Sequence, residues 1–419
     1  MIVTALTTHS ASQAHSEGPR GTGGIPRKLL AVLHCPYCGS RMDVEAHANA
    51  DPVHYGVLRC SCYQYPIIDG IPILRQIDGI DRIVRLVTGA ELSSALLRTL
   101  DVFRVQWARG GRLHRLQYYW DCIQFVRQKG MSFQDAARRV RKPGVFADYL
   151  IHRYANPSFL AGIAPMLLLE HVAAHNDVGP TWILDMACGA GHASFLMHLL
   201  FPAVSVLSVD SDFVSLYLAR RFMNPGGVHL CVDAQIPSPL PDKFCHAIYC
   251  LDAFHYLGSK KAFVSELKRI SQPDALWLFP HLHNRLCENP VAGVPLSPEG
   301  YLACFDSPES RLFVELDLLE GLTRDRSVNF CHKAPEAALN AAPALTLIRA
   351  RSDVYGVYRT FPSALCRKKQ HLHINPIYRR PSRRDSTLQR VWPNPLIRRE
   401  CAAAETVLPA TPVLSAKIG

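Results

Sequence analysis

The chain has 419 residues, of which 48% are hydrophobic and 19% charged, and its net charge is +11. This apolar content is sufficient to build a full core, which excludes a mainly disordered chain, and the length predicts two or three domains. The sequence has no window of about 18 uncharged apolar residues and no secretory signal, so we expect a cytoplasmic protein without a membrane span.

Composition divides the chain into five segments. Residues 1–28 are rich in Ser, Thr, Gly and His, so we expect them to be disordered. Residues 29–79 hold clustered cysteines, and residues 80–164 predict a helical spacer because Leu and Ile recur at helical spacing. Residues 165–365 alternate short β-rich runs with helical stretches, and residues 366–419 form a basic extension.

The positive charge is concentrated in two places. Residues 104–142 and residues 366–400 each carry a net charge of +8, whereas the stretch from 166 to 283 has a net charge of −3. Charge gathered in this way indicates either a surface that binds an anionic partner or solvated surfaces that keep the chain soluble. The acidic central stretch is suited to a cationic ligand.

Four cysteines of the N-terminal segment lie at metal-ligand spacing. Cys35 and Cys38 form a Cys-x-x-Cys pair, and the tighter pair Cys60 and Cys62 follows after 21 residues. Two thiolate pairs on neighbouring turns close a tetrahedral zinc site, which stabilises a module too small for its own core. We therefore predict a structural Zn²⁺ on these thiolates, with four metal-free thiols as the other interpretation. A histidine is the alternative fourth ligand, and the candidates are His34, His47 and His54.

The run from Leu58 to Leu74 carries a resemblance to a known family. Its most specific parts are Tyr65-Pro-Ile and Asp69-Gly-Ile-Pro. With these motifs the cysteine module resembles the small zinc-ribbon activator subunit of tRNA and protein methyltransferases. The resemblance implies a small β-sheet module with a structural metal, and a protein partner reached through this module.

The middle of the chain predicts a parallel α/β sheet. The helix expected over Lys260–Ser271 places Phe263, Leu267 and Ile270 on one apolar face. Alternating strands and helices are typical of a Rossmann-like sheet with ligands at the carboxyl ends of its strands. The predicted strands are Trp182–Met186, Val204–Val209, His229–Val232, His246–Leu251, Ala275–Phe279 and Ala344–Ala350. We expect residues 284–343 to be a loop-rich insertion, with a substrate lid over 284–301.

A glycine-rich turn follows the first of these strands. The strand ends at Asp185, the turn contains Gly189 and Gly191, and a helix is expected to open at His192. Glycines allow the backbone to approach a ligand closely, next to the free N–H groups of the helix N-terminus. Asp210 ends the second strand 19 residues after Gly191, a spacing that suits hydrogen bonds to a ribose diol. The acid before the turn disfavours a pyrophosphate and favours a cationic ligand.

The pattern over Trp182–His283 resembles the class I S-adenosylmethionine-dependent methyltransferases. Ala187 stands where the family usually has a glycine, and Asp274-Ala275 replaces its usual Gly-Gly. The resemblance implies S-adenosylmethionine as cofactor, with Asp210 on the ribose and Asp233-Ala234 beside the adenine. The cofactor-binding residues that it implies are Asp185, Ala187, Gly189, Gly191, Asp210, Asp233, Ala234 and Leu251.

Candidate catalytic residues lie at the ends of the fourth and fifth strands. They are Asp252 and His255 after the fourth strand, and His281, with His283 beside it, after the fifth. Positioning supplies much of the rate of a methyl transfer, and a general base helps only when the nucleophile must lose a proton. Packing roles for the histidines, and a loop-holding role for Asp252, are the alternatives.

Three functions follow from these motifs. We favour a methyltransferase for a small metabolite, because the stretch from Leu251 reads Leu-Asp-Ala-Phe and lacks the Asn-Pro-Pro-Tyr type of base-flipping tetrad. A methyltransferase for ribosomal or transfer RNA is the alternative, supported by the cysteine module and the two basic segments. A non-catalytic scaffold with a methyltransferase fold is the third, motivated by Ala187 and Asp274-Ala275.

Overall fold

The computed structural model describes residues 23–47, 50–105, 112–128, 130–141, 145–174, 180–288, 292–359, 377–382, 385, 387–400 and 410–412. Most of the N-terminal segment that we expect to be disordered, and most of the basic extension, therefore lie outside the described residues. The expectation of disorder up to residue 28 is wrong at its end, since Ile25 is fully buried and pairs with Val53.

The cysteine module is a small antiparallel sheet. Its strands pair in the order β1-β2-β3-β4, and a short helix, α2, precedes them. Each strand is only two to five residues long, so the sheet of this module is small. The elements are α2 (Arg27–Leu30), β1 (Asp43–Ala46), β2 (Gly56–Arg59), β3 (Gln64–Ile68) and β4 (Ile71–Pro72).

A series of helices follows, which confirms the predicted helical character of this region. In the first of them Ile80, Ile83, Val84 and Val87 form one buried stripe at helical spacing. Ser132 caps a later helix by accepting a hydrogen bond from the Asp135 amide. The helices are α3 (Ile80–Thr88), α4 (Leu92–Val105), α5 (Arg112–Arg127), α6 (Phe133–Val140), α7 (Val145–Ile151), α8 (Pro157–Met166) and α9 (Leu169–Ala174).

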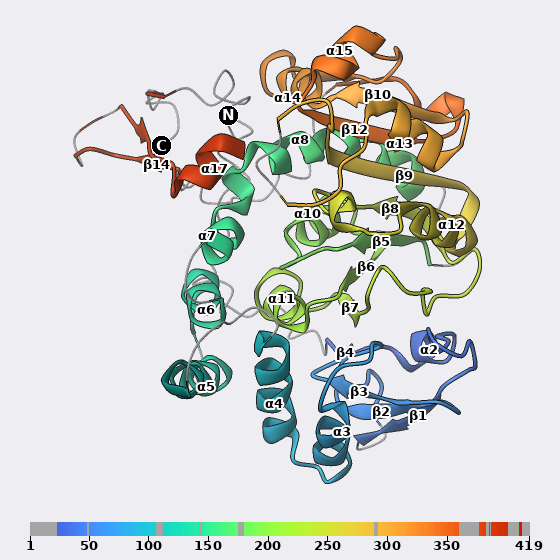
Figure 1. Cartoon of the computed structure of the whole chain (residues 1–419), viewed down its shortest axis with the longest axis vertical. Helices are drawn as coiled ribbons and strands as arrows, with labels where there is room; N and C mark the ends of the chain where they lie inside the picture. Colours follow the sequence, from blue (N-terminus) through green and yellow to red (C-terminus); the bar gives the residue numbers. More distant parts are fainter. Residues whose placement is uncertain are drawn as a thin grey trace.

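The centre of the molecule is a seven-stranded sheet in the order β10-β12-β9-β8-β5-β6-β7, in which β12 alone runs antiparallel to its neighbours (Figure 1). This arrangement confirms the Rossmann-like α/β fold. The chain order reverses between β5 and β8, and open α/β sheets bind ligands at such a switch point. The strands are β5 (Trp182–Met186), β6 (Ser205–Asp210), β7 (Val228–Cys231), β8 (Cys245–Tyr249), β9 (Ser271–His283), β10 (Ser310–Val314) and β12 (Ala344–Arg349).

Helices cover both faces of the sheet because both faces of its strands are apolar. Ile183 of β5 packs in one core with Phe159 of α8 and Leu196, whereas its neighbour Leu184 packs in another with Phe263. This alternation follows from the two-residue period of a strand. The covering helices after β5 are α10 (His192–Leu200), α11 (Phe213–Leu218) and α12 (Lys260–Ile270).

The expectation that residues 284–343 are loop-rich is wrong. The segment contains β10, which joins the central sheet, and several short elements. Ser297 caps one of these helices at the Gly300 amide, with Pro298 at its first position. The elements are α13 (Pro298–Phe305), α14 (Glu315–Glu320), β11 (Ser327–Asn329) and α15 (Glu336–Ala341), followed later by β13 (Val357–Arg359), β14 (Tyr378–Arg379), β15 (Gln389–Arg390) and α17 (Pro395–Glu400).

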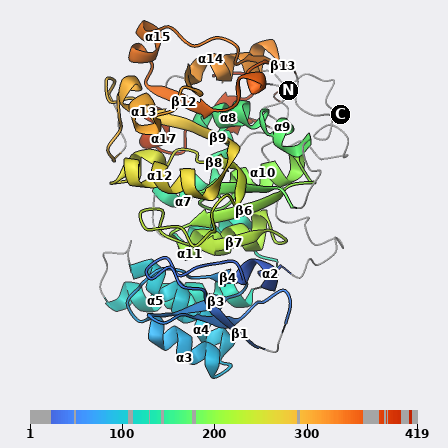
Figure 2. The ribbon, with the colours of Figure 1, turned by 90° about the vertical axis from the view of Figure 1, so that its right-hand side faces the viewer.

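The cysteine module is joined to the β7 edge of the sheet. After β4, Ile73 forms a parallel bridge with Cys231, and the Leu74 amide donates to the Cys231 carbonyl at 2.8 Å. Leu58 and Tyr65 share a core with residues of the large sheet. Both views place this module next to β7 (Figures 1 and 2), and β10 is the strand at the other end of the sheet. The module therefore covers an edge that would otherwise expose unpaired backbone groups.

Candidate active site

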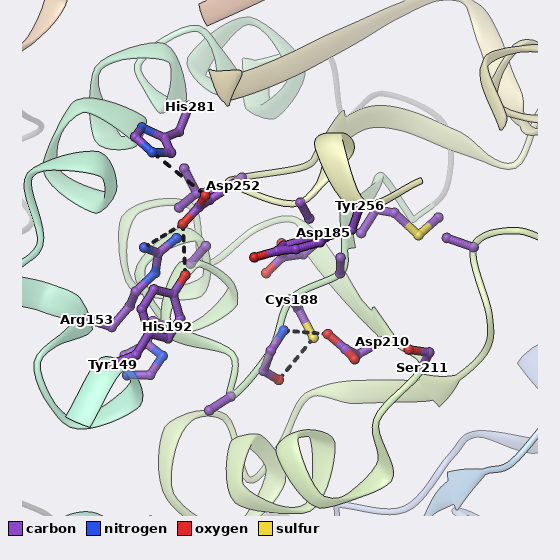
Figure 3. Close-up of a pocket in the computed structure, with 18 of the residues that line it drawn as sticks. Tyr149, Arg153, Asp185, Cys188, His192, Asp210, Ser211, Asp252, Tyr256 and His281 are labelled. Carbon is purple, nitrogen blue, oxygen red and sulfur yellow. Dashed lines mark hydrogen bonds and ion pairs between the residues drawn. The ribbon is translucent and has the colours of Figure 1, made fainter. Parts of the chain in front are cut away.

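A cavity of about 690 Å³ lies at the carboxyl ends of the central strands (Figure 3). Besides strand ends it is lined by side chains of α7, such as Tyr149 and Leu150. Ten of the predicted site residues line it: Asp185, Ala187, Gly189, Asp210, Asp233, Ala234, Leu251, Asp252, His281 and His283. Gly191 and His255 are not among its lining residues.

The glycine-rich turn after β5 forms one wall of the cavity. Ala187, Gly189 and Gly191 all have positive φ angles, of 56°, 55° and 77°. A Cβ added to Gly189 would meet nothing within 4 Å, whereas one on Gly191 would lie 2.8 Å from the Cβ of Ala219. Gly189 therefore keeps this wall open to a ligand, and Gly191 allows α10 to pack closely on the segment that follows α11.

Asp210 lies at the end of β6, beside this turn. Its Oδ2 accepts the Gly189 amide at 2.8 Å, and its Oδ1 accepts the Asp212 amide at 2.8 Å. Burial raises the pKa of Asp210 to about 6, in spite of the Gly189 hydrogen bond and the nearby Arg141. A carboxylate oxygen can accept more than one hydrogen bond, so both oxygens of Asp210 can still accept one from a ligand.

Asp185, at the other side of the turn, is 1% exposed. The Ser194 hydroxyl donates to its Oδ2 at 2.5 Å and lies 2.7 Å from the Ser208 hydroxyl. Burial raises the pKa of Asp185 to about 7, even though the Ser194 hydrogen bond acts in the opposite direction. A carboxyl poised in this way gains charge readily when a cation binds next to it.

The opposite end of the cavity is organised around Asp252, which follows β8 with a φ of 58°. Its Oδ2 accepts from the Tyr149 hydroxyl at 2.9 Å and from Arg153 Nη1 at 3.1 Å. Its Oδ1 lies 3.8 Å from His281 Nε2 and 3.6 Å from His283 Nε2. Figure 3 shows Tyr149, Arg153 and His281 converging on this carboxylate. We call Asp252, His281 and His283 the Asp-His-His cluster.

His281 is held from behind by Glu315 of α14. Its Nδ1 lies 2.9 and 3.0 Å from the two Glu315 oxygens. Burial disfavours the charged imidazole, but the Glu315 and Asp252 carboxylates outweigh it and raise the pKa of His281 to about 9. Burial also opposes ionisation of Asp252, yet His281, His283 and Arg153 hold the pKa of Asp252 well below its ordinary value.

His255 lies behind the cluster. It is 1% exposed, and its ring centroid is 4.4 Å from that of His283. Burial lowers the pKa of His255 to about 3, so the imidazole is neutral at physiological pH. His255 can therefore influence a ligand in the cavity only through the side chains next to it.

Arg153 and Glu315 are two site residues that the sequence did not reveal. Arg153 precedes the helix α8, and Glu315 opens α14 inside the segment expected to be loop-rich. Both are buried charged residues, at 6% and 8% exposure. Neither belongs to a motif, so only their partners in the fold identify them.

The four predicted zinc ligands meet in the N-terminal module. Cys35 Sγ lies 3.6 Å from Cys62 Sγ, which in turn lies 3.5 Å from Cys60 Sγ. The ligand atoms of these three residues and Cys38 all lie within 4.8 Å of one another. Sulfurs bound to one tetrahedral Zn²⁺ at about 2.3 Å would be about 3.8 Å apart, so the arrangement fits the ion.

Comparison with known proteins places a methyltransferase domain at this cavity. A family model described as "Methyltransferase domain" matches residues 184–279. A curated relative, the fatty-acid O-methyltransferase of Mycolicibacterium smegmatis, is 28% identical over 114 residues, which are 27% of this chain. This chain spans 41% of the length of that relative. The strands β5 to β8, with the glycine turn and Asp252, are thus part of a methyltransferase domain.

Two solved structures match parts of this chain at low similarity. The YcgJ protein from Bacillus subtilis is 17% identical and matches 44% of this chain and 98% of its own, with a TM-score of 0.30. A SAM-dependent methyltransferase from Aquifex aeolicus is 19% identical and matches 46% of this chain and 97% of its own, also with a TM-score of 0.30.

Among the helices that the structure describes, none has the length and apolar character needed to cross a membrane.

Proposed function

We propose that this chain is an S-adenosylmethionine-dependent methyltransferase that acts on an oxygen atom of a small acceptor. The observation that carries the proposal is the cavity of about 690 Å³, which joins the glycine turn and Asp210 at one end to Asp252 at the other. Cavities of about 300–1,000 Å³ are typical of small-molecule sites. The methyltransferase domain over residues 184–279 supports the same reaction class.

The glycine turn and the three acidic strand ends form the cofactor side. Bound S-adenosylmethionine would supply a methyl group on a sulfonium centre. We assign its ribose hydroxyls to Asp210, its adenine to Asp233 and Ala234, and its cationic portion to Asp185. The open wall at Gly189 leaves room for this ligand, since a Cβ there meets nothing. The remaining assigned residues are Ala187 and Leu251 as walls and Gly191 as a packing residue.

The acceptor side combines an apolar wall with a polar end. Phe146, Leu150, Phe159 and Leu257 line the cavity together with Asp252 and the two histidines. A mostly apolar acceptor with one polar oxygen matches this lining, and apolar burial supplies its affinity. The name of the curated relative, a fatty-acid O-methyltransferase, supports an oxygen acceptor of this kind.

We assign the acceptor oxygen to Asp252 and His281, with His255 as a supporting residue behind them. Tyr149 and Arg153 hold the Asp252 carboxylate, and Glu315 holds His281, so the groups that face the oxygen have few free rotations. Methyl transfer is an in-line displacement, for which such positioning supplies much of the rate.

We also assign a structural zinc ion to Cys35, Cys38, Cys60 and Cys62. The convergence of the four thiols supports it, and four thiolates would leave no position open for chemistry. Elemental analysis of the wild-type chain and of Cys35→Ser tests the assignment. We expect zinc to be lost in the variant, and a fully folded, zinc-free wild type would contradict the assignment.

Isothermal calorimetry with S-adenosylmethionine is the first test of the reaction class. We expect saturable binding by the full chain, and its absence at millimolar cofactor would leave the scaffold interpretation. Incubation of a cell extract with the protein and isotope-labelled cofactor, followed by mass spectrometry, then identifies the acceptor. Label in a small, mostly apolar molecule is the expected result, whereas label in RNA would establish the alternative acceptor.

A further inference from the structure

The Asp-His-His cluster brings together three side chains that are typical metal ligands. Their ligand atoms all lie within 4.8 Å of one another, and Asp252 Oδ1 is 3.6 and 3.8 Å from the two imidazole Nε2 atoms. These separations are too long for hydrogen bonds. Ligands about 2.0–2.2 Å from one tetrahedral ion would lie about 3.4 Å apart, so a small adjustment accommodates a metal ion.

Glu315 orients His281 in the way that a metal site requires. The carboxylate lies within 3.0 Å of Nδ1 and so selects the tautomer with hydrogen on that atom. When a metal ion displaces the proton from the other ring nitrogen, the lone pair that binds it is on Nε2, which is the atom that faces Asp252. A carboxylate behind a ligating imidazole is the usual outer partner in metal sites, where it fixes the ring and increases its basicity.

His283 provides the second, independent observation. It is 7% exposed, and its Nε2 has no hydrogen-bond partner among the residues that the structure describes. Buried polar atoms are nearly always paired in native proteins, so an orphan of this kind calls for an explanation. This nitrogen lies 3.6 Å from the charged Asp252 Oδ1. A metal ion between His283 Nε2 and Asp252 Oδ1 would give each of these atoms a partner.

Charge at this end of the cavity also favours a cation. With His281 neutral, as metal binding requires, the Asp252 and Glu315 carboxylates carry two negative charges, and Arg153 neutralises one of them through Asp252 Oδ2. Oδ1 is left to face the histidines. A divalent ion would convert this end to a net positive charge, which attracts an ionisable oxygen of the acceptor.

We propose that Asp252, His281 and His283 bind one divalent first-row metal ion of the Zn²⁺ class, with Glu315 as the orienting residue. Three protein ligands leave one coordination position open toward the cavity, and the acceptor oxygen binds the ion at that position. The binding of the acceptor oxygen rests on the proposed function. In the transfer, the acceptor O–H gives its proton to solvent, the oxygen forms the O–CH₃ bond, and the S–CH₃ bond breaks with its electron pair remaining on sulfur.

Cobalt tests the site in the unaltered full chain. The protein is first loaded with one equivalent of Zn²⁺ to fill the four-cysteine site, and Co²⁺ is then titrated. Co²⁺ on imidazole and carboxylate ligands gives visible d–d absorption without the strong charge-transfer band of Co²⁺ on thiolates. We expect d–d absorption that saturates at one Co²⁺ per chain. Lack of saturable absorption, or saturation only with the thiolate band, overturns the proposal.

Variants show whether the named residues hold the ion. His283→Asn removes a ligand and should abolish the d–d absorption, whereas Glu315→Gln should weaken Co²⁺ binding about 10- to 100-fold. His229→Asn is the matched control, because His229 is also buried but lies on β7, four strands away from β9. Unchanged Co²⁺ binding in Glu315→Gln contradicts the proposal even if His283→Asn fails to fold.

Calorimetry with S-adenosylmethionine on the same samples separates this proposal from the proposed function. Cofactor binding without the second metal site would refute the metal proposal and leave the methyltransferase assignment standing. Co²⁺ binding without cofactor binding would refute the methyltransferase assignment and keep the metal site. Loss of Co²⁺ binding in His283→Asn, with cofactor affinity retained, is the result that supports both.

Discussion

The two ends of the cavity are built in different ways. The cofactor end comes from consecutive strand–helix units, in which the turn after β5 lies against Asp210 at the end of the next strand. The Asp252 end collects Tyr149 and Arg153 from before the domain's first strand and Glu315 from well after β9. The first end is therefore a local motif, whereas the second exists only once the whole chain has folded.

The largest expected effect is the loss of stability when Arg153 is replaced by methionine. The Arg153 and Asp252 side chains are 7% and 13% exposed, so Arg153→Met removes the cation that contacts a largely buried carboxylate. Removing one partner of a buried pair costs about 3–5 kcal/mol. We expect a loss of this size in the free energy of unfolding, measured by urea denaturation.

The control for this variant is Arg324→Met. Arg324 pairs with Glu320 at 3.0 Å, but its side chain is 53% exposed, so we expect a change of about 1 kcal/mol or less. Because the Arg153 side chain donates to Asp252 and Ser158, whereas Asp210 accepts from the glycine turn, cofactor affinity in folded Arg153→Met should stay within about twofold of the wild type. A large loss of cofactor affinity without a loss of stability would show that the two ends are not independent.

The next effect concerns the cofactor end. Asp210→Asn keeps an oxygen for the Gly189 amide but removes the negative charge that we assign to the ribose. Loss of charge-assisted hydrogen bonds costs about 1.5–3 kcal/mol. This corresponds to a dissociation constant for S-adenosylmethionine that is about 10- to 150-fold larger. Calorimetry measures the loss. The control is Asp242→Asn, which removes one of the two carboxylate partners of Arg269 at an exposed position outside the cavity. Equal affinities in the two variants would contradict the ribose assignment.

How much was predictable from the sequence follows the same division. The strand Trp182–Met186 and the turn after it were predicted because a buried apolar run, glycines and an acid are all close in sequence. β9 begins earlier than predicted, at Ser271, because its first residues, Ser-Gln-Pro-Asp, lack the apolar pattern of a strand. Glu315 was missed because short elements such as β10 and α14 carry little periodic signal.

A pH dependence of cofactor affinity should follow from Asp210. Burial raises the pKa of Asp210 to about 6, so the carboxylate is charged above that pH and protonated below it. Binding that needs the charged form should be constant at higher pH and weaken by about tenfold on lowering the pH to about 5. Calorimetry of wild type and Asp210→Asn measures this difference. An equally steep dependence in the variant would assign the titration to another group, such as Asp185.

The smallest effect should come from Ala187→Gly, which tests the turn itself. Ala187 has a φ of 56°, a left-handed conformation that costs a residue with a Cβ roughly 1–2 kcal/mol. Glycine removes this strain but adds about 0.4–1 kcal/mol of unfolded-state entropy, so we expect a gain in stability of about 1 kcal/mol or less. Ala190→Gly, in the same turn and 1% exposed but without a positive φ, should instead lose about 0.5–1 kcal/mol. Equal destabilisation of both variants in urea denaturation would mean that Ala187 carries no strain, and that its departure from the family glycine has no structural consequence.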